Sequence, residues 1–132
     1  MKKVKYSDRI DLNGVKPWPH EKKMAEALAD AGYMVKFKRK SERYKTSTAD
    51  AYLNGILWEF KSPTGKILSA VERNLRRCKG QSPRIVFDAR RMKKMPDQAI
   101  MREILAKAPY VTEVEKIIYI NKHGKCIDIY NK

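Results

Sequence analysis

Apolar residues recur along the chain at two different spacings, which separate the expected helices from the expected strands. A spacing of three to four residues predicts helices at about residues 19–31, 66–78 and 96–106. Alternating or continuous apolar runs predict strands at about residues 33–38, 49–53, 56–61, 84–88, 114–120 and 126–130. Residues 1–16 are polar and have no clear period. The predicted order is helix, three strands, helix and strand, followed by a helix and two strands.

This order predicts a mixed α/β or α+β fold, and we expect one domain over residues 1–132. A chain of 132 residues is long enough to bury one hydrophobic core. Hydrophobic residues make up 42% of the sequence, which excludes a disordered protein. We find no internal repeat, low-complexity segment or linker.

Proline and glycine residues mark the ends of several elements. Pro19 suits the first turn of the first helix, and Gly32 suits its C-terminal cap. The dipeptide Asn54-Gly55 lies between two strand-like runs. It favours a two-residue hairpin turn, because both positions of such a turn need a positive φ.

The two-residue turn also sets the register of the hairpin, since pairs can be counted outward from it. Ala51 then faces Trp58, and Asp50 faces Glu59. One face of the hairpin is wholly apolar and is predicted to face the core; it holds Ala49, Ala51, Leu53, Ile56, Trp58 and Phe60. The opposite face holds Asp50, Tyr52, Leu57, Glu59 and Lys61.

The second face carries the candidate chemistry. Asp50 and Glu59 would begin about 5 Å apart, where like charges destabilise a strand pair. A divalent cation offsets that repulsion, since hard cations prefer oxygen ligands. Lys61 lies on the same face and can orient or activate a water, or stabilise a pentavalent phosphate. These three residues together are typical of metal-assisted phosphodiester hydrolysis.

The alternative interpretation of this face is a solvated hairpin with an ordinary ion pair. An Asp followed at a loose distance by Glu-x-Lys arises often by chance in a chain so rich in charge. The register favours the catalytic interpretation, because the two acids meet while the opposite face is wholly apolar.

Glu21 is the next candidate metal ligand. It lies in line with Ala25 and Leu28 on the first helix, so it is predicted to point toward the core side. Its alternative role is the favourable placement of a carboxylate at a helix N-terminus. Spacing alone does not separate the two roles.

The charge of the chain indicates a polyanionic partner. Thirty Lys and Arg residues against fifteen Asp and Glu leave a net charge of +15, and nucleic acid is the first candidate. Two basic groups would contact it; the alternative for both is a solvated surface. The candidate nucleic-acid-binding residues are Arg39, Lys40, Arg43 and Lys45, interleaved with Tyr44, and Arg73, Arg76, Arg77 and Lys79, with Gln81 next to them.

Other site types have weaker support. Cys78 and Cys126 do not form a Cys-x-x-Cys pair, so a disulfide is not implied. His123 and Cys126 supply two zinc ligands where a structural zinc site needs about four, which favours a turn histidine and a buried thiol. The sequence has no long apolar run of the kind that would indicate a membrane partner. The basic N-terminus lacks an apolar signal segment, so we expect a cytoplasmic site of action.

Two stretches of the chain resemble a known group of enzymes. Thr48-Ala49-Asp50, followed by Trp58-Glu59-Phe60-Lys61, is similar to the split acidic motif of the PD-(D/E)XK nuclease superfamily, with Ala49 at the usual proline position. His20-Glu21 opening a helix and the run A-D-A-Y-L-N-G-I-L-W-E-F-K-S resemble the C-terminal nuclease domains of contact-dependent growth inhibition toxins of the CdiA type. Related stand-alone proteins occur on bacterial mobile elements. The resemblance covers roughly residues 17–90.

The resemblance implies a restriction-endonuclease-like core with an added helix and a C-terminal β-hairpin. It also implies a metal-dependent endonuclease using Mg²⁺ or Mn²⁺, with Zn²⁺ as a further option. Its catalytic set would be Glu21, Asp50, Glu59 and Lys61, with the three carboxylates as metal ligands and Gln81 as a helper. RNA, in particular tRNA, is the favoured substrate. The expected partners are nucleic acid and an acidic cognate inhibitor protein, without a membrane or a small-molecule cofactor.

Three alternatives remain at this point. A DNA endonuclease of a mobile element would use the same residues on a different substrate. A non-catalytic module on the same fold would bind nucleic acid without metal. A metal-independent RNase would need histidines, but His20 and His123 have no obvious partner in the sequence.

Overall fold

The computed structural model describes residues 6–39, 50–77 and 82–132. Within these residues a seven-stranded mixed sheet runs in chain order from one edge to the other. Its strands are β1 (Ile10–Asp11), β2 (Val35–Phe37), β3 (Ala51–Leu53), β4 (Ile56–Lys61), β5 (Arg84–Asp88), β6 (Lys116–Ile120) and β7 (Cys126–Asn131). The helices are α1 (Pro19–Asp30), α2 (Ser69–Arg76) and α3 (Asp97–Lys107), with short 3-10 turns η1 (Tyr6–Arg9) and η2 (Ala108–Tyr110).

The sheet combines parallel and antiparallel pairs. The strands β4, β5 and β6 are parallel neighbours, and β1 is parallel to β2. The pairs β2–β3, β3–β4 and β6–β7 are antiparallel. Parallel strands are usually joined by a crossover helix, and here α2 connects β4 to β5 while α3 connects β5 to β6.

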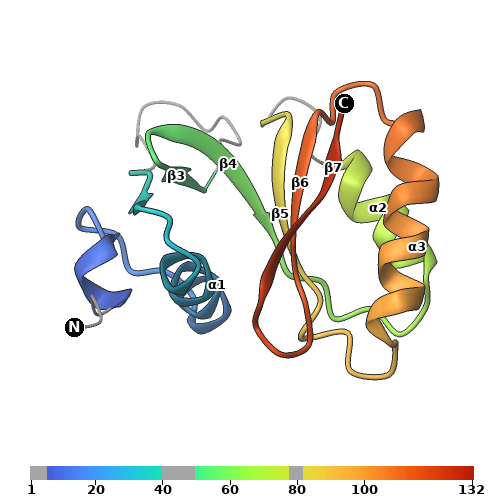
Figure 1. Cartoon of the computed structure of the whole chain (residues 1–132), viewed down its shortest axis with the longest axis horizontal. Helices are drawn as coiled ribbons and strands as arrows, with labels where there is room; N and C mark the ends of the chain where they lie inside the picture. Colours follow the sequence, from blue (N-terminus) through green and yellow to red (C-terminus); the bar gives the residue numbers. More distant parts are fainter. Residues whose placement is uncertain (1–5, 40–49, 78–81) are drawn as a thin grey trace.

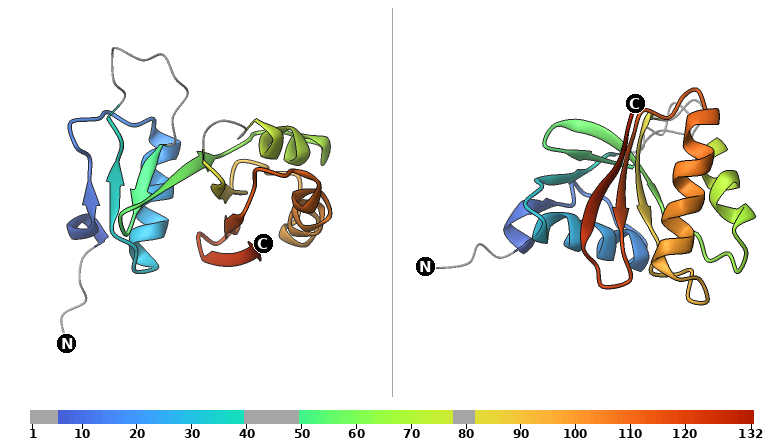
Figure 2. Two further views of the ribbon diagram at one scale, coloured as in Figure 1. Left: turned by 90° about the horizontal axis from the view of Figure 1, so that it is seen from above. Right: turned by 45° about the vertical axis from the view of Figure 1, so that its right-hand side comes forward.

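Helices cover both faces of the sheet (Figure 1). Alternate residues of each strand point to opposite faces, so each face has its own hydrophobic cluster. On the α1 face, Met24 and Leu28 pack with Phe60, Val86 and Ile118. The α2 and α3 face is lined by another buried set, which includes Val71, Leu75, Ile85, Phe87, Ile100, Ile104, Ile117 and Tyr119. In Figure 2, β4 runs from the elements on the α1 side to those on the side of α2 and α3.

The predicted mixed α/β fold and the order of its main elements are confirmed. The predicted bounds of several elements are too wide: the second helix was expected over residues 66–78 and is observed as Ser69–Arg76. The strand expected over residues 33–38 is observed as Val35–Phe37. The pattern gave no sign of η1 and β1, because β1 has only two residues and depends on its distant partner β2.

One residue on the predicted apolar face of the hairpin is not in the core. Ile56 is 48% exposed and is the first residue of β4, directly after the turn. Ala51, Leu53, Trp58 and Phe60 are buried as predicted, while Ala49 lies outside the described residues. No helix among the described residues is long and apolar enough to cross a membrane.

Candidate active site

The hairpin turn positions the candidate chemistry. Asn54 and Gly55 have φ values of 50° and 83°, as the two-residue turn requires. The Asn54 side-chain oxygen accepts a hydrogen bond from the Met34 amide at 2.8 Å, and this ties the turn to β2. The predicted register is confirmed within β3 and β4, with Leu53 opposite Ile56 and Ala51 opposite Trp58; the predicted pair Asp50–Glu59 lies just beyond the paired residues.

Asp50 precedes β3 and holds three strands together. Its amide donates to the Trp58 carbonyl at 3.0 Å, and its own carbonyl accepts from the Lys38 amide at 3.0 Å. Its carboxylate oxygen Oδ2 accepts from the Phe60 amide at 2.8 Å. The side chain therefore takes the place of a backbone acceptor just before the start of β3, which holds it beside Glu59.

Glu59 is a buried acid, with only 5% of its surface exposed. Burial, followed by a hydrogen bond to the Asp50 side chain, raises the pKa of Glu59 to about 9. The charge of Asp50 acts in the same direction. The two carboxyl groups are thus in direct contact, and one proton between them relieves their repulsion near neutral pH.

Lys61 is the cation of this group. Its Nζ lies 3.8 Å from Glu59 Oε1, and its side chain is 15% exposed. The positive charge lowers the Glu59 pKa, but less than burial and Asp50 raise it. Lys61 is therefore close enough to bind an anionic substrate group that approaches the acid pair.

The Glu21 carboxylate is bonded at the start of its own helix. Its Oε1 accepts a hydrogen bond from the Trp18 amide at 2.9 Å, which satisfies a free donor at the start of α1. Its charge still reaches Glu59 and contributes to raising that pKa. The bond to the Trp18 amide shows the role at the helix N-terminus, while the role of Glu21 as a metal ligand stays a prediction.

The acid pair suits a hard divalent cation. Two carboxyl groups that share a proton present oxygens where a cation can replace that proton. Mg²⁺ is commonly held by one or two carboxylates, with waters and phosphate oxygens as the remaining ligands. Among the described residues no group of three or more His, Cys, Asp or Glu side chains is arranged to hold a metal. Asp50 and Glu59 would therefore be the inner ligands, with Glu21 outside them.

The other candidate zinc ligands have structural roles. The Cys126 thiol donates to the Ala27 carbonyl at 3.5 Å, and burial raises the pKa of this thiol to about 11. His123 is exposed in the turn before β7, where its amide donates to Asn121 Oδ1. The turn histidine is confirmed, and the thiol is half-buried. Cys78 lies outside the described residues.

The basic groups expected to bind nucleic acid are only partly described. Arg39 donates to the Asn13 carbonyl at 2.9 Å and lines a cavity of about 650 Å³ together with Lys36, Lys38 and Tyr52. Arg73 and Arg76 on α2 and Arg77 directly after it are exposed, and Arg76 pairs with Glu72 at 3.4 Å. The remaining members lie outside the described residues: Lys40, Arg43, Tyr44, Lys45, Lys79 and Gln81.

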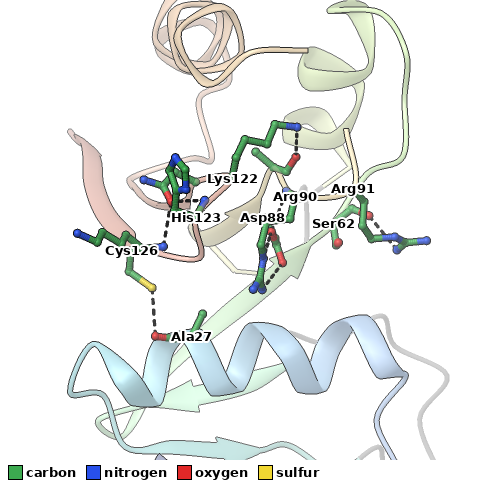
Figure 3. Close-up of polar contacts among 11 residues, drawn as sticks. Ala27, Ser62, Asp88, Arg90, Arg91, Lys122, His123 and Cys126 are labelled. Atoms are coloured by element: carbon green, nitrogen blue, oxygen red, sulfur yellow. Dashed lines mark hydrogen bonds and ion pairs between the residues drawn. The ribbon is translucent and has the colours of Figure 1, made fainter. Parts of the chain in front are cut away.

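A group of charged residues that the pattern did not single out lies at the end of β5. Asp88 is 2% exposed and binds the Arg90 guanidinium at 3.0 and 2.8 Å (Figure 3). With Arg91 and Lys93, these residues line a second cavity, of about 630 Å³. The available signal was a charged residue at the carboxyl end of an apolar strand, the usual position of ligand sites in open α/β sheets.

Comparison with known proteins gives a fold and a family for the chain. A search of curated proteins gave no match. A solved structure described as the CdiA-CT/CdiI toxin and immunity complex from Burkholderia pseudomallei is similar over 92% of this chain and 98% of its own, with 18% identity and a TM-score of 0.72. At that identity the likeness shows the fold. Residues 46–126 match the family described as the contact-dependent growth inhibition CdiA C-terminal domain. Because that match covers more than half of the 132 residues, the chain belongs to the contact-dependent growth inhibition CdiA C-terminal domain family.

Proposed function

We propose that this protein is a metal-dependent endonuclease of the PD-(D/E)XK type that hydrolyses phosphodiester bonds, with RNA, in particular tRNA, as the favoured substrate. The observation that carries the proposal is the direct contact of the Asp50 and Glu59 carboxyl groups, with Lys61 Nζ 3.8 Å from Glu59. The net charge of +15 supports a polyanionic substrate.

The acid pair is better explained by catalysis than by folding. A buried carboxyl whose pKa is raised by burial and by a second carboxyl makes a poor structural element, because it destabilises the folded state as it ionises. A hydrophobic side chain in place of Glu59 would pack between β3 and β5 without that cost. Perturbed acids of this kind gather at functional sites.

Each residue of the group has a role in the proposed reaction. Asp50 and Glu59 would hold Mg²⁺ or Mn²⁺, which supplies Lewis acidity and lowers the pKa of an attacking water. Lys61 binds a non-bridging oxygen of the scissile phosphate and stabilises the negative charge that develops in the transition state. Glu21 orients the site from the start of α1. The Phe60 amide holds Asp50 in position through its bond to Oδ2.

A cognate inhibitor protein is the second proposed partner. The similar solved structure is described as a toxin and immunity complex. A strongly basic nuclease is best inhibited by an acidic protein, because complementary charge speeds association and competes with nucleic acid for the same surface. We therefore propose an acidic inhibitor for this chain.

The test is incubation with total tRNA and, separately, with plasmid DNA, with Mg²⁺, with Mn²⁺ and with excess EDTA. We expect cleavage of tRNA in the presence of metal and none in EDTA. Asp50→Asn, Glu59→Gln and Lys61→Met should abolish it. Asp30→Asn removes an exposed carboxylate at the end of α1 and should leave it unchanged. Undiminished cleavage in EDTA would overturn the metal requirement, and cleavage of plasmid alone would assign DNA as the substrate.

A further inference from the structure

We propose that the cavity at the carboxyl ends of β4 and β5 binds a backbone phosphate of the substrate strand, next to the bond that is cut. The inference rests on the proposed nuclease function and adds the path of the substrate. The cavity has a volume of about 630 Å³, and its lining residues come from α1, from the segment after β4 and from the loop after β5. Four of them are the cations Lys23, Arg90, Arg91 and Lys93.

The cavity carries more positive charge than its own acid neutralises. Asp88 accepts two hydrogen bonds from the Arg90 guanidinium and one from the Arg90 amide, so its carboxylate is satisfied by one cation. Lys23, Arg91 and Lys93 have no carboxylate partner among the described residues. Three uncompensated cations around one cavity attract a polyanion.

The loop that displays these cations is held in place before any ligand arrives. The Lys122 ammonium donates to the Ala89 carbonyl at 2.8 Å and also to the Met92 carbonyl. The Ala89 amide donates to the Ile120 carbonyl at 3.0 Å, which continues the ladder between β5 and β6. Arg91 donates to the Ser62 carbonyl at 3.0 Å, as Figure 3 shows. Binding an anion therefore requires little ordering of the loop, which favours affinity.

The position of the cavity relates it to the acid pair. Lys61 and Phe87 are paired at the ends of the parallel strands β4 and β5, so the segments that follow both strands lead into the cavity. Thr64, which lines it, is three residues beyond Lys61, a reach of at most about 10 Å of extended chain. His20 lines it from the first turn of α1, next to Glu21, whose charge reaches Glu59.

These features favour a nucleic-acid strand over a small anion. The cations are distributed over two elements and do not converge on one point: Lys23 lies on α1, while Arg91 and Lys93 lie on the loop after β5. Arg91 uses one nitrogen for Ser62 and keeps further N–H donors for phosphate. The Ser62 carbonyl that Arg91 binds follows Lys61 directly in the chain, so a strand lying in the cavity would run past the end of β4, which carries Glu59 and Lys61.

The test measures binding without cleavage. Every protein carries Asp50→Asn, and fluorescence anisotropy follows a labelled single-stranded RNA with Mg²⁺ over a range of salt concentrations. Adding Arg91→Gln and Lys93→Gln should raise the Kd by about ten- to a hundredfold and lower the slope of log K against log salt by about 1 to 2. The matched control adds Arg102→Gln and Lys107→Gln on α3, which removes the same charge away from the cavity; its Kd should change by less than about threefold.

Each outcome decides one of the two proposals. Equal losses of RNA affinity in the double variant at the cavity and in the double variant on α3 would show a general charge effect and would overturn the phosphate site. An unchanged Kd for Arg91→Gln with Lys93→Gln would overturn it too. Thermal melting of every variant identifies losses of binding that are caused by unfolding. If the double variant is unfolded, the single variant Lys93→Gln replaces it, because the Lys93 side chain makes no hydrogen bond to the described residues. If binding falls as expected while the unsubstituted protein never cleaves, the phosphate site stands and the nuclease proposal fails.

Discussion

At the scale of single residues, Asp50 and Glu59 have different tasks although both are acids. Asp50 is half-buried and bound by the Phe60 amide, whereas Glu59 is buried and raised in pKa. The register of β3 against β4 was predictable from the Asn54-Gly55 turn alone, because a two-residue turn leaves one register. The Phe60–Asp50 bond was not predictable, since it depends on a side chain replacing a backbone acceptor just before β3 begins.

The raised pKa of Glu59 predicts the pH dependence of stability in the metal-free protein. The folded pKa of about 9 lies above the value of about 4.5 in the unfolded chain, so the folded state binds the proton more tightly. The contribution of this proton to the free energy of unfolding is fully present below the unfolded pKa. It is lost as the pH rises toward 9, by at most about 1.4 kcal/mol per pH unit. Urea unfolding in EDTA at several pH values measures it. Glu59→Gln should flatten the plot of the free energy of unfolding against pH, and the exposed control Glu113→Gln should leave its slope unchanged.

Substitutions of Asp50 separate folding from catalysis. Asp50→Asn keeps an oxygen for the Phe60 amide and removes a charge, so metal-free stability should stay equal or rise by about 0.5–1 kcal/mol. Catalysis should fall by orders of magnitude, because metal binding needs anionic oxygens. Asp50→Ala also removes the acceptor and should cost about 1–3 kcal/mol. Melting curves and nuclease assays compare the two; a clearly destabilised Asp50→Asn that still cuts would mean that the site is wrongly assigned.

At the scale of elements, the loop between β5 and α3 depends on a side chain from the turn between β6 and β7. Lys122 Nζ binds the Ala89 and Met92 carbonyls, while Asp97 accepts hydrogen bonds from the Lys122 amide and the Tyr119 hydroxyl. The periodic pattern predicted the flanking strands and α3 well, because their buried faces repeat. It could not predict this connection, because the partners are about thirty residues apart and both lie in irregular segments.

Replacing Lys122 should loosen the loop that carries Arg91 and Lys93. Lys122→Met keeps most of the volume but removes the charged donor from two carbonyls, each of which keeps one bond from a backbone amide; losing these charge-assisted bonds should lower the free energy of unfolding by about 1–3 kcal/mol. Hydrogen exchange should show faster exchange of the loop amides after β5, with α1 unchanged. A variant with native stability and native exchange would show that the ammonium does not hold the loop. Lys125→Met, which changes an exposed lysine of the same turn, is the matched control.

At the scale of the whole molecule, the net charge contributes little to the stability of the fold. The described ion pairs are few, and the buried clusters on the two faces of the sheet are almost wholly apolar. The excess of fifteen positive charges therefore adds little to stability and is available for a partner. Composition alone indicated that partner class. It could not show where the charges gather, because the cavity between α1 and the loop after β5 is formed by segments far apart in the chain.

Binding to nucleic acid should depend steeply on salt. Each phosphate contact releases counterions, so log K should fall linearly with log salt, with a slope of about −0.7 to −0.9 per contact. Charge reversal at Arg76 and Arg77 should weaken binding to different sequences by similar factors. Anisotropy titrations between low and physiological salt measure both effects. A flat salt dependence would contradict the assignment of the surface charge to phosphate contacts.

The edge position of β1 has a mechanical consequence. This strand is joined to β2 by only two residue pairs, with support from the Arg9 and Asn13 side chains, which bond the Ala29 and Phe37 carbonyls. A pulling force applied from the N-terminal side should therefore detach β1 first and then peel away α1. The cluster beneath α2 and α3 shares no residue with those elements and should resist to a higher force. An optical-trap extension trace should accordingly show two steps, the smaller one first.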